Sequence, residues 1–134
     1  MVLCDTNILI EFYKNTRRVV QELRHIGQNR LAVSVVTLAE LYFGALNKAE
    51  LQKMKQHLLL LHQLPLDVRI SERFLQLIET YSLSHKLSIP DAMIAATAIV
   101  HGLELYTLNR RDFQFISGLK LYESVNESSS PHKR

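Results

Sequence analysis

Short β-prone runs alternate with longer segments of helical periodicity along this chain. The runs are VLC (2–4), LAVSVV (31–36), LELYT (103–107) and LKLY (119–122). Segments with helical spacing separate the first three runs, and this alternation predicts a parallel β-sheet flanked by helices. We therefore predict an α/β fold.

The segments between the runs carry apolar faces at helical spacing. The segment 49–63 has an apolar stripe at three- and four-residue steps, made of Leu51, Met54, Leu58 and Leu61. Ser71 is the predicted N-cap of a helix over 72–84, and Ser88 that of a helix over 88–100. Small residues let this last helix pack close to the sheet, namely Ala92, Ala95, Ala96 and Ala98.

The end of the chain differs from the rest in composition. Residues 124–134 read SVNESSSPHKR, which is polar and has no periodicity. We predict one ordered domain over 1–123 and a polar C-terminal tail over 124–134.

Length and composition exclude several classes of protein. The 134 residues, of which 47% are hydrophobic and 22% charged, fit a single globular domain. A net charge of +3 permits an anionic partner without requiring one. The single cysteine, Cys4, lies in an apolar run, which predicts a buried thiol and a cytoplasmic protein. The run LLLL at 58–61 is far short of the ~20 apolar residues of a membrane span, so we expect no membrane association.

Four carboxylates stand where the predicted elements begin or end. Asp5 directly follows the first β-prone run, and Glu40 lies in the first turn of the helix expected after the second run. Asp91 lies at the start of the alanine-rich helix, and Asp112 follows the run LELYT. Ligands of parallel sheets bind beyond the carboxyl ends of the strands, so we expect the four carboxylates to converge there.

Each of these acids also has an ordinary structural explanation. Thr37 and Glu40 have the spacing of a capping box, in which a Thr N-cap is followed three residues later by Glu. Asp91 complements the positive end of a helix, and Asp112 suits a solvated loop that Phe113 could anchor. Their joint placement at one edge of the sheet is what favours a functional interpretation.

A cluster of carboxylates indicates a metal site. Carboxylates in one place repel each other and burial increases the cost, so at neutral pH the site needs protons or a cation. Oxygen donors without a set of Cys and His ligands indicate Mg²⁺ or Mn²⁺ rather than zinc. His57 and His62 lie five residues apart in the predicted helix over 49–63, and therefore on different faces.

Four segments resemble, in the same order, the signature segments of the PIN-domain ribonucleases, in particular the VapC-type toxins of bacterial toxin–antitoxin pairs. They are CDTNILI (4–10), SVVTLAELYFG (34–44), IPDAMIAATA (89–98) and YTLNRRDF (106–113). The resemblance implies a single PIN-like domain with metal-dependent endoribonuclease activity. It also implies Mg²⁺ or Mn²⁺ as the cofactor, and tRNA or another structured RNA as the substrate.

The resemblance also implies roles for particular residues. The matching acidic positions, expected to be catalytic and metal-binding, are Asp5, Glu40, Asp91 and Asp112. The accompanying polar positions, expected to support the acids, are Thr6, Asn7, Thr107 and Asn109. Whether Asn109 or Asp112 fills the fourth position stays open. Asp5 and Asp91 are the expected principal ligands, and Glu40 is expected to hold a water or act as a base.

Partners follow from the same resemblance. It implies a homodimer, a cognate antitoxin that inhibits the toxin, and a hetero-oligomer that binds operator DNA through the antitoxin. The apolar stripes at 41–46 and 51–61 suit docking, although we expect most of these residues to be core. The expected RNA phosphate contacts, for which a simply solvated face is the alternative, are Arg110, Arg111, Arg17 and Arg18.

Other classes fit the sequence less well. A haloacid-dehalogenase-type phosphotransferase needs a second Asp two residues after Asp5, where this chain has Asn7. A receiver-type signalling domain needs an acidic pair before its phospho-acceptor, and the chain has no Gly-Lys-[Ser/Thr] run of a P-loop. The remaining alternative is a PIN-like module without catalysis that binds RNA or protein.

Overall fold

A five-stranded parallel sheet forms the centre of the computed structural model, which describes residues 1–125. The strands are β1 (Val2–Cys4), β2 (Leu31–Ser34), β3 (His62–Leu64), β4 (Glu104–Tyr106) and β5 (Lys120–Leu121). They lie in the order β3-β2-β1-β4-β5, and every pairing is parallel. The α/β fold predicted from the sequence is therefore confirmed.

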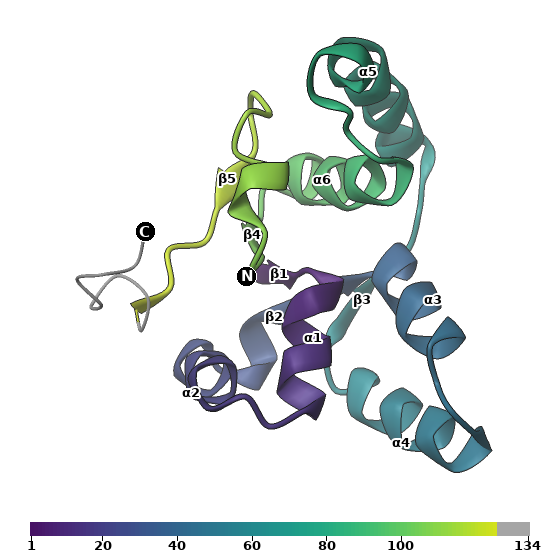
Figure 1. The fold of residues 1–134 in the computed structure, drawn as a ribbon, viewed down its shortest axis with the longest axis vertical. Helices are drawn as coiled ribbons and strands as arrows, with labels where there is room; N and C mark the ends of the chain where they lie inside the picture. Colours follow the sequence, from purple (N-terminus) through teal and green to yellow (C-terminus); the bar gives the residue numbers. More distant parts are fainter. Residues whose placement is uncertain (126–134) are drawn as a thin grey trace.

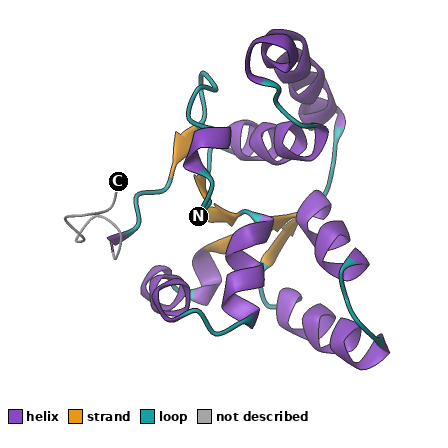
Figure 2. Ribbon diagram, in the orientation of Figure 1, coloured by secondary structure: helices purple, strands orange, loops and turns teal. Residues whose placement is uncertain are grey.

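Helices cover both faces of the sheet (Figure 1). They are α1 (Thr6–Tyr13), α2 (Arg17–Ile26), α3 (Val35–Phe43), α4 (Lys48–Leu58), α5 (Val68–His85) and α6 (Ile89–His101). Two 3₁₀ turns, η1 (Gln28–Arg30) and η2 (Arg110–Asp112), complete the described elements. The layers are also visible in Figure 2, where α5 and α6 lie on one side of the strands and α1, α2 and α4 on the other. In this three-layer arrangement the helices leave the carboxyl ends of the strands accessible, and the four candidate carboxylates follow or face these ends.

Alternate residues of the central strand face two separate cores. Val2 and Cys4 pack with α1, α2 and α4, whereas Leu3 packs with α5 and α6. Burial, followed by the charge of Asp5, raises the pKa of the Cys4 thiol to about 12. The predicted buried and unreactive thiol is thus confirmed.

Helix starts differ from the predicted ones at two places, because Asp and Ser residues farther upstream cap the helices. Asp67, not Ser71, caps α5, and its carboxylate accepts a hydrogen bond from the Ile70 N–H at 2.8 Å. Ser34, not Thr37, caps α3, so that β2 ends two residues before the predicted boundary. Ser88 caps α6 as predicted.

The predicted helix over 49–63 is too long. The helix α4 ends at Leu58, and His62 begins the short edge strand β3, which the sequence pattern does not reveal. His57 and His62 therefore belong to different elements. The three residues HQL of β3 include none of the Val, Ile, Thr, Phe, Tyr or Trp side chains that are typical of strands, so nothing in them indicates a strand.

The apolar stripes at 41–46 and 51–61 divide between core and surface. The prediction of a core role is confirmed for Leu41, Met54, Leu58 and Leu61, which are buried. It is wrong for Phe43, which is 94% exposed, and for Leu46 and Leu59, which are also exposed. No helix within residues 1–125 combines the length and apolarity needed to cross a bilayer.

The ordered chain continues to the end of the described residues. The Ser124 hydroxyl donates to a carboxylate oxygen of Glu22 at 3.0 Å, and the Val125 N–H donates to the other oxygen at 3.1 Å. Of the predicted tail over 124–134, residues 126–134 lie outside the described residues.

Candidate active site

Asp5 lies between two strands and the first helix. It follows β1, its N–H donates to the Tyr106 carbonyl at 2.9 Å, and it is the N-cap of α1. Its carboxylate is 5% exposed and accepts from the Thr6 N–H at 2.8 Å and from the Thr107 hydroxyl at 2.7 Å. Each carboxylate oxygen thus has a fixed donor, which sets the orientation of the group.

Glu40 is part of a hydrogen-bonded chain of side chains and does not belong to a capping box. Ser34 Oγ accepts from the Thr37 N–H at 3.1 Å, which leaves Glu40 in the second turn of α3. Glu40 Oε1 accepts from the Thr6 hydroxyl at 2.6 Å, and the hydroxyls of Thr6 and Thr37 lie 3.0 Å apart. The predicted capping box is therefore wrong, because the helix begins earlier and frees the carboxylate to meet Thr6.

Asp91 enters from the other side of the sheet. Its N–H donates to Ser88 Oγ at 3.2 Å, in the first turn of α6, and the residue is half-buried. The helix lies deep in the molecule because Ala92, Ala95, Ala96 and Ala98 are fully buried. The predicted partial burial of Asp91 is thus confirmed.

The loop after β4 carries Asp112 and Asn109 on exposed positions. Phe113 is 1% exposed and packs in the core beside α6 and β4, so it anchors the loop as predicted. The Asn109 N–H donates to Thr107 Oγ1 at 3.0 Å, and Asn7 binds the same loop by accepting from the Leu108 N–H at 3.2 Å. The loop is therefore tied to the residues that hold Asp5.

The four carboxylates share one electrostatic environment. Burial is the main cause that raises the pKa of Asp5, against the donors Thr107 and Thr6, and the charges of Glu40 and Asp112 raise it further. Burial also raises the pKa of Asp91 to about 6, followed by the charge of Asp5 and by smaller effects of Asp112 and Glu40. The charges of Glu40 in α3 and Asp112 in η2 thus act on Asp5, which follows β1, and on Asp91 in α6, so these residues lie near one another at the carboxyl edge of the sheet.

This acidic site fits a hard cation by its donor chemistry. All four candidate ligands offer carboxylate oxygens, and their mutual repulsion favours a positive charge among them. Among residues 1–125, no three His, Cys, Asp or Glu side chains are arranged closely enough, as they are oriented here, to coordinate one metal ion.

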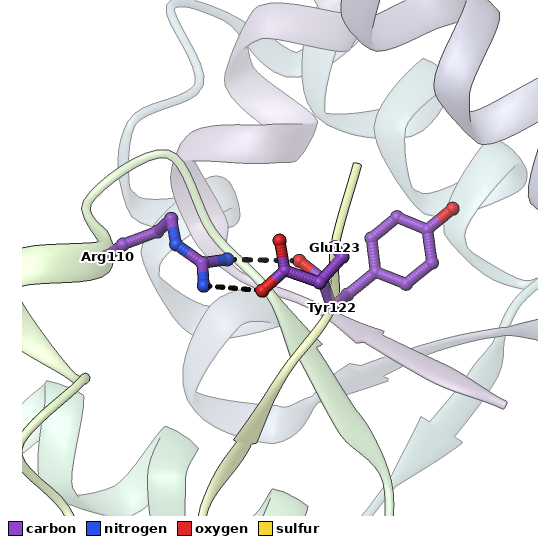
Figure 3. Close-up of polar contacts among 3 residues, drawn as sticks. All are labelled: Arg110, Tyr122 and Glu123. Carbon is purple, nitrogen blue, oxygen red and sulfur yellow. Dashed lines mark hydrogen bonds and ion pairs between the residues drawn. The ribbon is translucent and has the colours of Figure 1, made fainter. Parts of the chain in front are cut away.

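The arginines predicted to contact phosphates lie in different surroundings. Arg110 donates to Glu123 at 2.9 Å and to the Tyr122 carbonyl at 3.2 Å (Figure 3). Arg111 is exposed beside Asp112. Arg17 and Arg18 begin α2, and α1 separates them from Asp5 by its length of roughly 12 Å. The structure thus brings Arg111 to the acidic edge and places the α2 pair away from it.

Sequence reasoning missed the hydroxyl of Thr37 as part of this site. Thr37 is buried, and its Oγ1 meets the Thr6 hydroxyl that also binds Glu40. A signal was present in the spacing of Thr37 and Glu40, which lie one turn apart and therefore on one face of a helix.

The comparisons with known proteins agree with this architecture. The family model described as PIN domain matches residues 2–118. The chain is 33% identical over 124 residues to "Ribonuclease VapC10" of Mycobacterium tuberculosis, which covers 90% of this chain and 91% of the relative. It is 29% identical to the "tRNA(fMet)-specific endonuclease VapC" of Shigella flexneri, covering 88% of this chain and 93% of that one.

Solved structures share the fold over nearly the whole chain. A toxin-antitoxin complex from Klebsiella pneumoniae contains a chain that is 35% identical, with a TM-score of 0.78. The match covers 92% of this chain and 99% of that chain. Other solved neighbours are VapBC and FitAB assemblies, some of them bound to DNA.

Proposed function

Because this chain belongs to the PIN-domain family and to its VapC group of ribonucleases, we propose that it is the endoribonuclease toxin of a toxin–antitoxin pair. We propose further that it hydrolyses RNA phosphodiester bonds at the acidic site with the help of Mg²⁺ or Mn²⁺. The observation that carries the proposal is the convergence of the acids: Thr6 donates to both Asp5 and Glu40, and, beyond the effect of burial, the charges of Glu40 and Asp112 raise the pKa of Asp5 and of Asp91.

The carboxylates have separate roles in this proposal. Asp5 and Asp91 are the proposed cation ligands, because both are withdrawn from solvent and the charge of Asp5 raises the pKa of Asp91. A divalent cation, when bound, supplies Lewis acidity that activates a water and neutralises charge on the phosphate. Glu40, whose Oε1 accepts from the Thr6 hydroxyl, is the proposed base that would accept the proton of an attacking water. Asp112, on its exposed loop, is placed to orient the water or the phosphate.

Thr6 and Thr107 position the acids. Thr6 donates its N–H to Asp5 and its hydroxyl to Glu40, so that one residue fixes the proposed ligand relative to the proposed base. Thr107 donates its hydroxyl to Asp5 and accepts from the N–H of Asn109. Such fixed donors lower the cost of organising charged groups at the moment of reaction.

The substrate must bring phosphates toward an acidic surface. Arg111 is the proposed phosphate contact at this edge, because it is exposed next to Asp112. Arg110 is a weaker candidate, since it is bound to Glu123 and the Tyr122 carbonyl. Arg17 and Arg18 could contact only a part of the RNA that extends beyond α1.

The proposed RNA substrate and partners are inferred from the relatives in the VapC group. We propose a structured RNA, with tRNA as the first candidate, because a relative carries the name of a tRNA(fMet)-specific endonuclease. A cognate antitoxin inhibits the toxin, and operator DNA is bound through the antitoxin in the complex. We propose that the toxin is a homodimer and acts in the cytoplasm, where its RNA substrate and a reduced Cys4 are both expected.

The test is cleavage of purified tRNA and of total RNA by the purified chain. We expect cleavage with Mg²⁺ or Mn²⁺, none with EDTA, and none after Asp5→Asn or Asp91→Asn in a folded protein. Glu104→Gln is the matched control, since Glu104 is exposed at the other end of β4, and should cleave normally. Cleavage by both Asp variants would refute the assigned roles. RNA binding without cleavage by the parent would favour the non-catalytic module.

A further inference from the structure

A buried hydroxyl lies behind the proposed base. Thr37, in the first turn of α3, is 0% exposed. Its Oγ1 atom lies 3.0 Å from the Oγ1 atom of Thr6, whose hydroxyl donates to Glu40 Oε1 at 2.6 Å. The three side chains thus form a chain of hydrogen bonds that joins α1 to α3 and ends at the buried Thr37.

The direction of these hydrogen bonds follows from the number of protons. An ionised carboxylate only accepts, so the single proton of the Thr6 hydroxyl points at Glu40. The Thr6 oxygen then has only lone pairs to turn toward Thr37, and the contact between the two hydroxyls is a hydrogen bond only if Thr37 donates. The Thr37 hydroxyl therefore donates to Thr6, and the Thr6 hydroxyl donates to Glu40.

The Glu40 side chain is held by a single hydrogen bond. The residue is exposed, and it borders a groove of about 400 Å³ that is also lined by Ile10, Leu46 and Met54. Within residues 1–125, the Thr6 hydroxyl is the one hydrogen-bond donor to the Glu40 carboxylate, and no ion pair restrains that carboxylate. A glutamate at a surface has many rotamers available. The orientation of this carboxylate therefore depends on the Thr6 hydroxyl.

The Thr37 hydroxyl in turn has one partner. Among the residues that the structure describes, Thr6 alone forms a hydrogen bond with the Thr37 Oγ1 atom. Burying a hydroxyl costs free energy, which its hydrogen bond must offset. Valine has the same branched shape and would fill the position without that cost, so packing and helix formation do not by themselves require a threonine. The contact with Thr6 accounts for the hydroxyl.

We infer that Thr37 is a positioning residue for the proposed base: by donating to Thr6 it keeps the Thr6 hydroxyl turned toward Glu40, and so holds the Glu40 carboxylate in place. The inference rests on the proposed ribonuclease function, in which Glu40 accepts the proton of a water. In Thr37→Val the Thr6 oxygen faces a methyl group and loses its donor. Thr6 is only partly buried, so its hydroxyl then rotates toward solvent and releases Glu40.

The first measurement is the rate of RNA cleavage with Mg²⁺ or Mn²⁺. We expect Thr37→Val to lower kcat by about tenfold, the lower limit for losing a group that orients a side chain of a metal site. The KM for RNA should stay unchanged, because no RNA contact is removed. Thr37→Ser keeps the hydroxyl and should recover most of kcat. Thr97→Val is the matched control, since Thr97 is also buried in a helix and its hydroxyl donates to the Met93 carbonyl.

The second measurement does not depend on cleavage. Three-bond NMR couplings report the side-chain rotamer of Thr6 in the metal-free protein. We expect one fixed rotamer in the parent, in Thr37→Ser and in Thr97→Val, and an average over several rotamers in Thr37→Val. Thr37→Ala also removes the hydroxyl, adds no volume, and should behave as Thr37→Val does.

The outcomes separate the inference from the proposed function. A fixed Thr6 rotamer or an unchanged kcat in both Thr37→Val and Thr37→Ala would overturn the inference. A loss of kcat that Thr37→Ser or Thr97→Val shares in full would also overturn it, since the hydroxyl would then not be the cause. Absence of cleavage by the parent, with the Thr6 rotamer responding as expected, would overturn the proposed ribonuclease function and leave the role of Thr37 in holding Thr6 intact.

Discussion

Asp5 and Glu22 are both buried carboxylates, but their surroundings are opposite in kind. Glu22 is fully buried and accepts hydrogen bonds from the Tyr122 hydroxyl, the Ser124 hydroxyl and the Val125 N–H. Asp5 also has donors, yet the charges of Glu40 and Asp112 act on it as well. Glu22 is thus surrounded by hydrogen-bond donors alone, as far as the described residues show, whereas Asp5 has both donors and like charges around it.

The difference separates a structural acid from a functional one. Glu22 joins α2 to the end of the described chain, and its donors compensate for the loss of water. The acids around Asp5 cost stability as long as they face only each other, and that cost is offset when a ligand of opposite charge arrives. Burial alone would not have distinguished the two residues, whereas the identity of their neighbours does.

The largest expected effect is the loss of stability in Glu22→Ala. The substitution leaves the Tyr122 and Ser124 hydroxyls and the Val125 N–H without their acceptor, so we expect the free energy of unfolding to fall by about 3 kcal/mol. Asp5→Asn is the comparison and should leave it unchanged or raised, because it removes a repelled charge. Urea unfolding of both variants measures this. A loss in Asp5→Asn as large as that in Glu22→Ala would abolish the distinction.

A smaller effect concerns pH. The pKa of Asp91 is raised from its usual 3.8 to about 6 in the folded protein, so the folded state holds its proton more tightly than the unfolded state does. The stability from this group is full below about pH 4 and is lost as the pH rises through 6. We expect the metal-free protein to lose about 2 kcal/mol between pH 4 and 7 from this residue. Urea unfolding as a function of pH measures the loss.

Asp91→Asn is the control for this pH dependence and should remove most of it. Added Mg²⁺ should restore stability at pH 7, because a ligand that binds the folded state alone stabilises it. A protein whose stability rises between pH 4 and 7 equally in the parent and in Asp91→Asn would show that the acids at this edge do not repel each other as the structure indicates.

The sequence predicted the elements that have strong local signals. Ser88, Pro90 and the following alanines placed α6 correctly, because cap, first turn and small packing face all agree there. Asp5 and Asp91 were found because each stands directly at a change of element. Their convergence followed from the parallel topology, which brings strand ends to one edge.

The failures came from tertiary context that local signals do not contain. Both Ser34 and Thr37 are good N-caps, and only the point at which β2 leaves the sheet decides between them. The strand β3 exists because β2 offers it an edge, as the pairing of Val33 with Gln63 illustrates. Glu22 lies on the face of α2 that becomes buried against the distant residues Tyr122 and Ser124. Its role therefore could not be seen in its own segment.

A further test of the comparison removes a donor from Asp5. Thr107→Val deletes the hydroxyl that binds the Asp5 carboxylate, so the pKa of Asp5 should rise further and its orientation should loosen. We expect cleavage to slow by about tenfold, the lower limit for losing support of a metal ligand. Thr107→Ser keeps a hydroxyl and should recover most of the rate. Thr97→Val is the matched control, since the Thr97 hydroxyl donates to the Met93 carbonyl within α6. A rate equal to the parent's in Thr107→Val would mean that Asp5 needs no such support.

The smallest effect is expected where the two regions meet, at the ion pair of Arg110 with Glu123 (Figure 3). Their side chains are 37% and 76% exposed, so the coupling measured by a double-mutant cycle should be about 0.5 kcal/mol or less and should vanish in high salt. Glu123→Gln should therefore leave cleavage unchanged.

Arg110→Gln distinguishes two roles of Arg110, as a partner of Glu123 or as an RNA phosphate contact. A loss of stability with unchanged cleavage would assign Arg110 to the ion pair. Slower cleavage with a weaker salt dependence of RNA binding, as expected for Arg111→Gln, would instead make Arg110 a phosphate contact.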